Sequence, residues 1–527
     1  EVNLLNQLAS AMQNAPVPAY VRAVAAAMPY LRADRLPLRL DIDAIPDWML
    51  DGFIRWSFYS PQAFTEIGEV DRLVDHYERW MRHLLERFEQ RKSPRDRAAV
   101  VSAANGLTCI PWYFTDRNLK PAMSLRARLI ESACEATGQG LDHAFGPRPA
   151  GRKIRLGIIN GDFAERTETY ATLSIFEKLD KEKFEVYLYA SAVSGQPFEL
   201  RCNLAAHKFT TLTGSVPEQV AAIRGDDLDV LVFGFNLVGI TRPNVIVAAH
   251  RLARIHVNLF CSPATSGLRH MDCFLSGDAC EPPGAEEEFT EKLIRLPGPG
   301  FCLAMPTQSP PPTVRFSRQM LGAPENATVF ISGANMHKIT PEQMDLWARV
   351  LARTPDSVLV LYPFGPAWSS SYPAGVFLRM CNMTLARHGV SGNRLIVTRA
   401  VPDRADVKEL VRIGDVYLDS FRHSGCVSLV DTLESAVPPV VFEGTRLRTR
   451  QGAAMMRAMG LDELVAGDEE SYIRIATTLA GDPARRADLA ARINAAMAAT
   501  PAFLDSARHS AAVGEVFERL VADLPRA

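Results

Sequence analysis

The chain has 527 residues, of which 47% are hydrophobic and 22% are charged, with a formal net charge of −2 at pH 7. These values are ordinary for folded soluble domains and exclude a chain that is mainly disordered. The near-neutral total argues against a nucleic-acid partner, and no apolar run reaches the roughly 20 residues that span a bilayer.

Nine cysteines are scattered along the chain, and no pair has the C-x-x-C spacing of a zinc or redox site. The first residues lack the basic-then-apolar order of a signal peptide. We therefore expect a reducing, cytoplasmic location. A chain of this length exceeds what one hydrophobic core serves, so we expect two to four domains.

Residues 1–150 have the pattern of amphipathic helices. Apolar side chains recur there at three- and four-residue steps, as in Leu73, Tyr77, Trp80, Leu84 and Phe88. Alternating apolar strands are missing from this range, and no 34-residue self-similarity marks a helical repeat array. The run Gly-Pro-Arg-Pro-Ala-Gly at 146–151 then breaks the periodic pattern. We predict an all-α, non-repetitive domain that ends near residue 150.

From residue 151 the pattern changes to short apolar runs separated by helical stretches, which is typical of buried parallel strands. The runs form two series: 154–159, 185–190, 229–233, 255–260 and 272–276, and then 328–332, 357–362, 394–398, 415–419 and 439–442. A proline-rich link at 310–312 separates the series. We predict an α/β fold with two doubly wound, Rossmann-like units, 151–310 and 311–527. Because such sheets bind ligands at the carboxyl ends of their strands, the cleft between the units is the expected active site.

Residues 424–431, Ser-Gly-Cys-Val-Ser-Leu-Val-Asp, follow a predicted strand and have the pattern of a helix start. Ser424 is a plausible N-cap, and Gly425 lets a ligand approach the backbone. The first N–H groups of such a helix present partial positive charge to a diphosphate. Asp431 lies on the same predicted helix, where its carboxylate could accept both hydroxyls of a ribose. An ordinary capped helix with a surface aspartate has the same spacing, so spacing alone leaves both interpretations open.

Residues 335–343, Asn-Met-His-Lys-Ile-Thr-Pro-Glu-Gln, follow the predicted strand at 328–332. Thr340 and Gln343 have the spacing of a capping box, and Pro341 suits the first helical position. Lys338 therefore lies on a loop at the carboxyl end of a strand. A lysine there can neutralise a leaving diphosphate without a metal, and a solvated surface lysine is the alternative.

These two segments resemble the glycosyltransferase family that contains the protein O-GlcNAc transferases, the plant SPINDLY fucosyltransferases and the bacterial adhesin N-glucosyltransferases. The resemblance extends through 438–444, 450–453 and 460–466. It implies that Lys338 contacts the donor phosphates and that Asp431 holds the donor ribose. The donor-binding candidates are then Asn335, Lys338, His423, Ser424, Gly425, Cys426, Val427, Ser428 and Asp431.

Three residues beside these segments have weaker patterns. His337 and His423 flank the donor segments and could hydrogen-bond phosphate or sugar, although a structural histidine is the simpler interpretation of each. Arg422 could contact phosphate, but an arginine beside a strand end more often forms an ordinary surface pair.

The first α/β half also resembles the family. Residues 156–163 are similar to its opening strand and loop, and residues 262–267 are similar to its sugar-facing loop. The resemblance therefore covers about 151–527, and it implies that Pro263, Ala264, Thr265 and Ser266 form a sugar or acceptor loop. The helical segment around 110–114 is more similar to the helical domain of the adhesin glucosyltransferases than to a tetratricopeptide array.

The chain departs from the family pattern at three places. The loop after Asp162 contains no histidine, although many members carry one there. Gly267 ends the Pro-Ala-Thr loop, as in O-GlcNAc transferases, where the adhesin enzymes have a histidine. Val427 stands where relatives often have a polar residue. The acceptor proton could pass to the donor phosphate, to a carboxylate such as Asp162, or to water, and the sequence leaves these alternatives open. The catalytic candidates are thus Lys338 and Asp162.

The resemblance implies a GT-B architecture and inversion at the anomeric carbon, with no metal and no cofactor beyond the nucleotide-sugar donor. The expected reaction transfers a sugar from UDP-glucose or UDP-GlcNAc to an Asn or Ser/Thr side chain of a protein acceptor. The helical domain is the expected place for the acceptor. Two alternatives remain: a GDP-fucose-dependent protein O-fucosyltransferase, and a non-catalytic scaffold that binds a sugar nucleotide.

Overall fold

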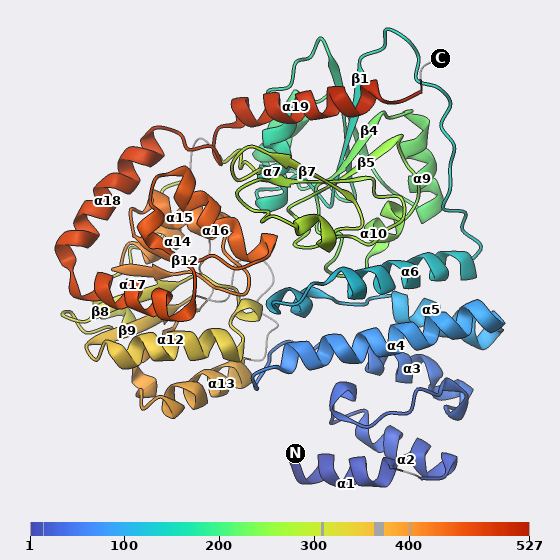
Figure 1. The fold of residues 1–527 in the computed structure, drawn as a ribbon, viewed down its shortest axis with the longest axis horizontal. Helices are drawn as coiled ribbons and strands as arrows, with labels where there is room; N and C mark the ends of the chain where they lie inside the picture. The colour runs from blue at the N-terminus through green and yellow to red at the C-terminus, as the bar shows by residue number, and fades with distance from the viewer. Residues whose placement is uncertain are drawn as a thin grey trace.

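The computed structural model describes residues 2–13, 15–306, 310–362, 374–399, 401 and 403–525. Three parts follow one another along the chain: a helical domain and two α/β units (Figure 1). In this view the blue helical domain lies below the green first unit, and the yellow-to-red second unit lies beside both. Within the described ranges, no helix combines the length and the apolar character needed to cross a bilayer.

The N-terminal domain is all-α, as predicted. Its helices are α1 (Val2–Met12), α2 (Val17–Ala27), α3 (Asp47–Ser57), α4 (Glu69–Arg91), α5 (Pro94–Ala104) and α6 (Lys120–Ala136), with 3-10 helices at Ala33–Arg35, Ile42–Ala44 and Ile110–Phe114. The predicted amphipathic stripe lies on α4, where Leu73, Tyr77, Trp80, Leu84 and Phe88 are each at most 1% exposed. The ring of Trp80 packs edge-on against Phe53 of α3, with centroids 5.5 Å apart. Aromatic burial along α4 thus ties α3 to the centre of the domain.

The first α/β unit begins at residue 154. Its elements are β1 (Ile154–Asn160), α7 (Thr167–Phe176), β2 (Phe184–Ala190), α8 (Pro197–Ala205), β3 (Lys208–Thr211), α9 (Val216–Gly225), β4 (Val230–Phe233), α10 (Pro243–Ala248), β5 (Ile255–Leu259), β6 (Cys273–Gly277) and β7 (Lys292–Leu296), with a 3-10 helix at Ala285–Glu288. The strands form one parallel sheet in the order β3-β2-β1-β4-β5-β6-β7.

The second unit has the same winding. Its elements are α11 (Arg318–Leu321), β8 (Thr328–Ser332), α12 (Pro341–Arg353), β9 (Ser357–Leu361), α13 (Ala374–Arg387), β10 (Leu395–Val397), α14 (Arg404–Val411), β11 (Val416–Leu418), α15 (Val427–Glu434), β12 (Pro439–Phe442), α16 (Leu447–Ala458), β13 (Val465–Ala466), α17 (Glu469–Gly481), α18 (Pro483–Ala498) and α19 (Ser506–Ala522), with 3-10 helices at Met336–Lys338, Gly392–Arg394 and Asp462–Leu464. Its parallel sheet has the order β10-β9-β8-β11-β12-β13. Two doubly wound units are therefore confirmed.

Each of the ten predicted strands is present, with both ends within one residue of the prediction. The strands that the sequence does not predict are β3, β7 and β13, and each is an edge strand of its sheet. An edge strand is half solvated and lacks a continuous apolar run, as the partly exposed residues of β3 illustrate. The pattern of buried strands is therefore visible in the sequence, whereas that of edge strands is weak.

The C-terminus returns to the first unit. Helix α19 lies across that unit and packs against α7 (Figure 1). The Ser510 hydroxyl donates to the Ile175 carbonyl at 2.7 Å, and Phe517 of α19 is fully buried. The sequence analysis assigns residues 506–522 to the second unit, but the structure packs them on the first.

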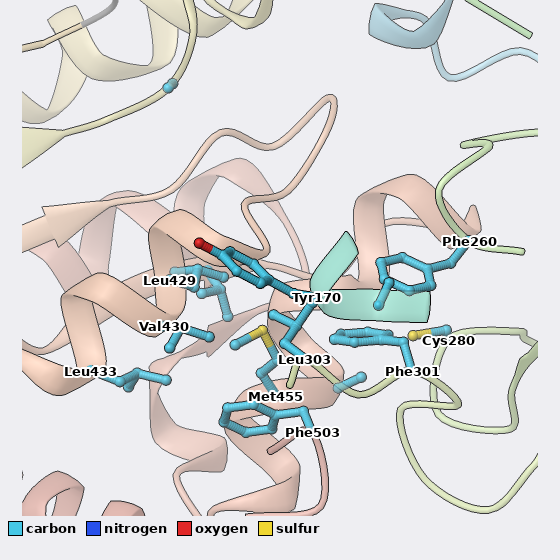
Figure 2. Packing of buried hydrophobic residues seen from close by; sticks show 14 of the residues in the cluster. Tyr170, Phe260, Cys280, Phe301, Leu303, Leu429, Val430, Leu433, Met455 and Phe503 are labelled. Atoms are coloured by element: carbon cyan, nitrogen blue, oxygen red, sulfur yellow. The ribbon is translucent and has the colours of Figure 1, made fainter. Parts of the chain in front are cut away.

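The α/β units share an apolar interface. It contains Tyr170, Phe260, Phe301 and Leu303 from the first unit and Leu429, Val430, Leu433, Met455 and Phe503 from the second (Figure 2). Phe260 and Phe301 stack with ring centroids 4.7 Å apart, and the Leu303 N–H donates to the Phe503 carbonyl at 2.9 Å. Full burial of such a side chain contributes roughly 1.5–3 kcal/mol. This interface holds α15 in place against the first unit.

The first sheet also joins the helical domain. Along β1, Ile158 faces the core shared by the α/β units, while the next residue, Ile159, faces the core shared with the helical domain. Side chains of a strand alternate between its two faces, so one strand serves both cores. The three parts are therefore packed through continuous apolar contacts.

Candidate active site

Both sheets reverse their strand order at one point, between β1 and β4 and between β8 and β11. In doubly wound folds, ligands bind at this point, beyond the carboxyl ends of the strands. The loops that follow β1, β4, β8 and β11 all contribute to one cavity of about 1130 Å³. The cleft predicted from the sequence is thus present as a hollow at both switch points.

The two segments with the family pattern meet beside this cavity: Asn335, Lys338 and His423 line it, whereas no residue of 424–431 is among the described residues that do. Lys338 ends the 3-10 helix after β8, and Ser424 lies in the loop between β11 and α15. The Lys338 ammonium donates to the Ser424 carbonyl, with 2.9 Å between Nζ and O. Because β8 and β11 are neighbours in the sheet, the lysine reaches the adjacent loop directly. The predicted phosphate-contacting lysine therefore lies beside the loop that leads into α15.

Ser424 holds this loop together and does not cap the helix. Helix α15 begins at Val427, with Cys426 at the N-cap position and no side-chain cap. The Ser424 hydroxyl donates to Asp419 Oδ2 at 2.6 Å and accepts from the Gly452 N–H at 2.9 Å. The predicted N-cap role of Ser424 is therefore wrong, because two buried neighbours already engage its hydroxyl.

Gly425 is fixed by the same carboxylate. Its N–H donates to Asp419 Oδ1 at 2.9 Å, and a Cβ at this position would lie 2.5 Å from the Ser428 hydroxyl. Only a glycine therefore fits without moving a neighbour. The first turn of α15, which starts at Val427, presents backbone N–H groups that have no partner within the helix. Such a turn is suited to bind an anion.

No described carboxylate forms an ion pair with Lys338. Among the described residues, its only hydrogen-bond partner is the Ser424 carbonyl. Burial lowers the pKa of the lysine, while the nearby Asp419 acts in the opposite direction. Burial also raises the pKa of Asp419, whose oxygens are occupied by Ser424 and Gly425. A buried ammonium beside a helix start is suited to a bound anion.

Asp431 lies on α15, as predicted, but within an ion pair. The Arg404 guanidinium donates to its carboxylate with 2.5 Å between Nε and Oδ1, and it also pairs with Glu434 at 2.9 Å. Burial raises the pKa of Asp431 to about 6, against the lowering effect of Arg404. Only one oxygen of Asp431 is bonded to Arg404, so the other can accept a hydrogen bond from a ligand.

The cavity is lined by all three parts of the chain. The second unit contributes Asn335, His337, Lys338 and His423, and the first contributes Asp162, Arg166, Glu168, Asn236 and Arg242. The helical domain contributes the ends of α3 and α5, including Arg55, Tyr59 and Asn105. A cavity of about 1130 Å³ with walls from three parts of the chain has room for two ligands.

The segment 109–117 of the helical domain is wedged between the two α/β units. The Tyr113 hydroxyl donates to Asn236 of the first unit at 3.2 Å. The Phe114 ring stacks on His337 of the second unit, with ring centroids 6.5 Å apart. The helical domain therefore forms part of the site wall and is more than an appended module.

A buried arginine of α16 fixes this wedge. The Arg448 guanidinium donates to the carbonyl groups of Tyr113, Thr115 and Arg117 at 2.8–3.0 Å. Its own carbonyl accepts from the Ser424 N–H at 2.8 Å. Burial lowers the pKa of Arg448 to about 9. Arg448 thus connects the helical wedge to the loop that receives Lys338.

The two histidines and Arg422 have structural partners. Burial lowers the pKa of His337 to about 4 and that of His423 well below its usual value, so both rings are neutral at pH 7. His423 Nδ1 lies 3.1 Å from the Ser424 carbonyl. Arg422 forms an ion pair with Asp116 of the helical domain, which is the surface-pair interpretation. The histidines still line the cavity, where neutral rings can donate to a sugar or phosphate.

The loop with Pro263, Ala264, Thr265 and Ser266 is buried. The hydroxyls of Thr265 and Ser266 both donate to the buried carboxylate of Glu291, and the Ser266 N–H does so at 2.7 Å. None of the four residues is among the described residues that line the cavity. The loop therefore lies near the carboxyl edge of the first sheet, but the hydroxyls of Thr265 and Ser266 are hydrogen-bonded within the protein.

Asp162 lies in the cavity wall after β1, with an arginine as its partner. Arg166 pairs with it at 3.0 Å, and the Ala164 N–H donates to it at 3.0 Å. Glu168 lines the same wall and was missed by the sequence analysis, although it follows the same strand. Arg448 was missed as well, because its contacts with residues 113–117 span more than 330 positions of the chain.

Comparison with known proteins assigns the chain to a family. The family model described as glycosyl transferase family 41 matches residues 138–304 and 302–511. A probable UDP-N-acetylglucosamine–peptide N-acetylglucosaminyltransferase, SPINDLY of Arabidopsis thaliana, is 25% identical over 358 residues, which is 66% of this chain and 37% of that protein. A second probable UDP-N-acetylglucosamine–peptide N-acetylglucosaminyltransferase of the same plant, SEC, is 24% identical over 359 residues, 67% of this chain and 35% of its own length.

A solved structure supports the fold. A mutant of the O-GlcNAc transferase of Thermobaculum terrenum has a TM-score of 0.66 at 21% identity, over 99% of this chain and 97% of that one. The chain spans little more than a third of the length of the curated plant relatives it matches. The matched family model covers well over half of the chain, and the two parallel sheets have the GT-B arrangement. The chain therefore belongs to glycosyltransferase family 41.

Proposed function

We propose that the protein transfers a sugar from a UDP-sugar to a side chain of a protein acceptor, with inversion at the anomeric carbon and without a metal. The observation that carries this proposal is the contact between Lys338 and the Ser424 carbonyl, beside the open N-terminus of α15. In this contact a half-buried positive charge lies close to the first turn of α15, whose N–H groups have no partner within the helix, at the edge of a switch point.

The donor is bound by the second unit. Its diphosphate lies between the Lys338 ammonium and the first turn of α15, which begins at Val427. Its ribose hydroxyls donate to the free oxygen of Asp431. During transfer, negative charge develops on the leaving UDP, and Lys338 with the helix N-terminus stabilises this charge in the role that a metal has elsewhere.

The acceptor approaches from the opposite wall. The helical domain lines the cavity with Arg55, Tyr59 and Asn105, and the first unit adds Asn236 and Arg242. These groups can hydrogen-bond the backbone of an extended peptide while a side chain enters toward Lys338. The peptide acceptor named for the plant relatives supports this assignment.

The names of the relatives favour UDP-GlcNAc as the donor. UDP-glucose is the alternative UDP-sugar, and the acceptor group is either a Ser/Thr hydroxyl or an Asn amide. A GDP-fucose donor and a non-catalytic sugar-nucleotide scaffold are the competing functions. The scaffold is favoured by one observation: Asp162, the carboxylate expected as a base, is held by Arg166.

Thermal unfolding with nucleotides separates these functions. The protein is heated with UDP, GDP, UDP-GlcNAc, UDP-glucose and GDP-fucose, beside Lys338→Ala and Asp431→Ala. We expect a UDP-selective rise in Tm that both variants lose, since a ligand at 100 times its Kd stabilises by about 2.7 kcal/mol. A GDP-selective rise would instead assign the fucose donor.

Turnover is then measured as UDP release with the donor that stabilises the protein. Release that depends on added acceptor protein supports a transferase. Stabilisation by a sugar nucleotide with no release, either with acceptor or with water, would assign the scaffold function and overturn the proposed reaction.

A further inference from the structure

Two carboxylates line the cavity from the first unit, Asp162 and Glu168. They differ in their partners. Asp162 pairs with Arg166 at 3.0 Å and accepts from the Ala164 N–H at 3.0 Å. Both oxygens of Asp162 are therefore already engaged within its own loop.

Glu168 has no such partner. It lies in the first turn of α7 and is half-buried at the cavity wall. Among the described residues, its carboxylate receives a hydrogen bond only from its own backbone N–H. A half-buried carboxylate that faces a cavity without a side-chain partner is available to a substrate.

Glu168 shares its cavity with the donor segment of the second unit. The charged groups near it are Arg166 and Asp162, both on its own loop. From the second unit, Asn335 and Lys338 line the same cavity. Glu168 therefore lies in the wall of the hollow that also contains the lysine of the donor segment.

The chemistry of a general base fits this position. Burial raises the pKa of Glu168, against the lowering effect of Arg166. A base is most effective when its pKa lies near the working pH, and desolvation is a common way to raise that of a carboxylate. The loop after β1 carries no histidine, and its other carboxylate at the cavity, Asp162, is engaged by Arg166 and the Ala164 N–H.

We propose that Glu168 is the general base of the transfer, taking the proton of the acceptor group as it attacks the sugar. This proposal rests on the proposed function. The acceptor O–H bond breaks and its proton passes to the Glu168 carboxylate, while the acceptor oxygen forms a bond to the anomeric carbon. The bond from that carbon to the phosphate oxygen breaks, and its electron pair leaves with UDP beside Lys338.

Glu168→Gln tests the proposal with Glu165→Gln as the matched control. Glu165 lies three residues earlier on the same loop, is exposed, and does not belong to the described lining of the cavity. Transfer to protein and hydrolysis of the UDP-sugar by water are both measured between pH 5 and 9, with UDP binding followed by thermal shift. At saturating donor, where the effect of Asp431 on affinity does not enter, Glu168→Gln is expected to lower kcat about 10²–10⁴-fold and to remove the fall of kcat at acid pH.

Glu168→Ala adds a readout that a structural role would not move. Formate, a small carboxylate, is expected to restore part of its activity, and it should leave Glu168→Gln unchanged. Activity within threefold of the wild type in Glu168→Gln, or an unchanged acid limb, would overturn the assignment of the base. If the wild type binds UDP but neither transfers nor hydrolyses any UDP-sugar, the proposed function itself fails, and the base assignment fails with it.

Discussion

The ammonium of Lys338 is hydrogen-bonded to the carbonyl oxygen of Ser424 at 2.9 Å. This contact joins the loops of two neighbouring strands, β8 and β11, at the switch point of the second sheet. Within the part of the chain that the structure describes, no carboxylate forms an ion pair with this lysine. An anion placed between the lysine and α15 is therefore the natural partner of this charge.

Removal of this charge is expected to abolish most of the transfer. Lys338→Met should lower kcat by about 10²–10³, because a preorganised charge at the leaving group is lost. Tm should change little, since the variant loses one hydrogen bond but also removes a buried charge whose pKa burial has already lowered. UDP release and thermal unfolding measure both effects, with the exposed Lys178→Met as the control. Wild-type turnover in Lys338→Met would contradict the site.

Donor affinity is expected to fall at acid pH because of Asp431. Its pKa is raised to about 6 by burial, so the carboxylate takes up a proton as the pH falls through this value. A protonated carboxyl loses the charge that pairs with Arg404 and binds ribose hydroxyls, and affinity decreases. The effect on stability has the opposite sign: a native pKa above the unfolded value makes folding more favourable as the pH falls from about 6 toward 4.

The measurement is the Kd of UDP-GlcNAc between pH 5 and 8. Unlike UDP, this ligand has no phosphate group that titrates in the range. Asp431→Asn should bind weakly at every pH and lose the dependence, while Asp488→Asn on the exposed face of α18 should keep it. A wild-type profile that is flat through pH 6 would exclude Asp431 from the donor site.

The sequence predicts the sheets well because their central strands are continuous apolar runs. β8, 328–332, is predicted at its observed ends, since four of its five residues are buried. The edge strand β3 is missed, because its residues are partly exposed and begin with a lysine. Strands are therefore predicted well where they are buried. The composition of a short segment reveals a strand only when both faces of the sheet are covered there, because the run is then continuously apolar.

A residue of the site can be predicted from the sequence only when its role depends on a motif within one short segment. Lys338 and Asp431 each lie in a local motif, but the role of Ser424 depends on Asp419 and Gly452, which come from other segments. The contact of Arg448 with residues 113–117 joins two domains. The local sequence around Arg448 does not specify such a contact. In the sequence, this arginine cannot be distinguished from any other arginine on a helix.

Arg448 is expected to couple stability to donor binding. Arg448→Met leaves the carbonyls of Tyr113, Thr115 and Arg117 without their donor. The loss should cost about 2–4 kcal/mol of unfolding free energy, partly offset by removal of a buried charge. Because the backbone of Arg448 also supports Ser424, the affinity for UDP should fall too. Denaturant unfolding and UDP titration test this, and Arg474→Met on α17 should alter neither.

Glu281 is expected to destabilise the protein at alkaline pH. It is 4% exposed, and burial raises its pKa to about 7, although the Ser276 hydroxyl donates to it at 2.8 Å. The native state prefers the protonated form, so stability should rise as the pH falls from about 7 toward the unfolded value near 4.5. Glu281→Gln removes the charge and should stabilise at pH 8 by about 1–3 kcal/mol.

Denaturant unfolding of Glu281→Gln at pH 8 and pH 5.5 measures the effect. The gain over the wild type should be present at pH 8 and small at pH 5.5. The exposed Glu182→Gln, with a side chain that is 91% exposed, should behave as the wild type at both values. An equal gain at both pH values would assign the effect to packing and not to the ionised carboxylate.

Gly267 is expected to tolerate no side chain, which explains why this loop ends in glycine here. Its φ is +72°, and a Cβ would lie 2.5 Å from the Met123 carbonyl oxygen and 2.9 Å from the Ser124 nitrogen, both on α6. Backbone atoms of a helix cannot move aside as a side chain can. Gly267→Ala and Gly267→His should therefore separate α6 from the first unit and lower the free energy of unfolding by roughly 2 kcal/mol or more.

Gly298→Ala is the matched control: φ is +75° there, and no atom lies within 4 Å of the added Cβ. It carries the same backbone strain, about 1 kcal/mol, without the clash. Denaturant unfolding of the three variants separates the two costs, and equal losses in Gly267→Ala and Gly298→Ala would show that α6 does not press on this loop.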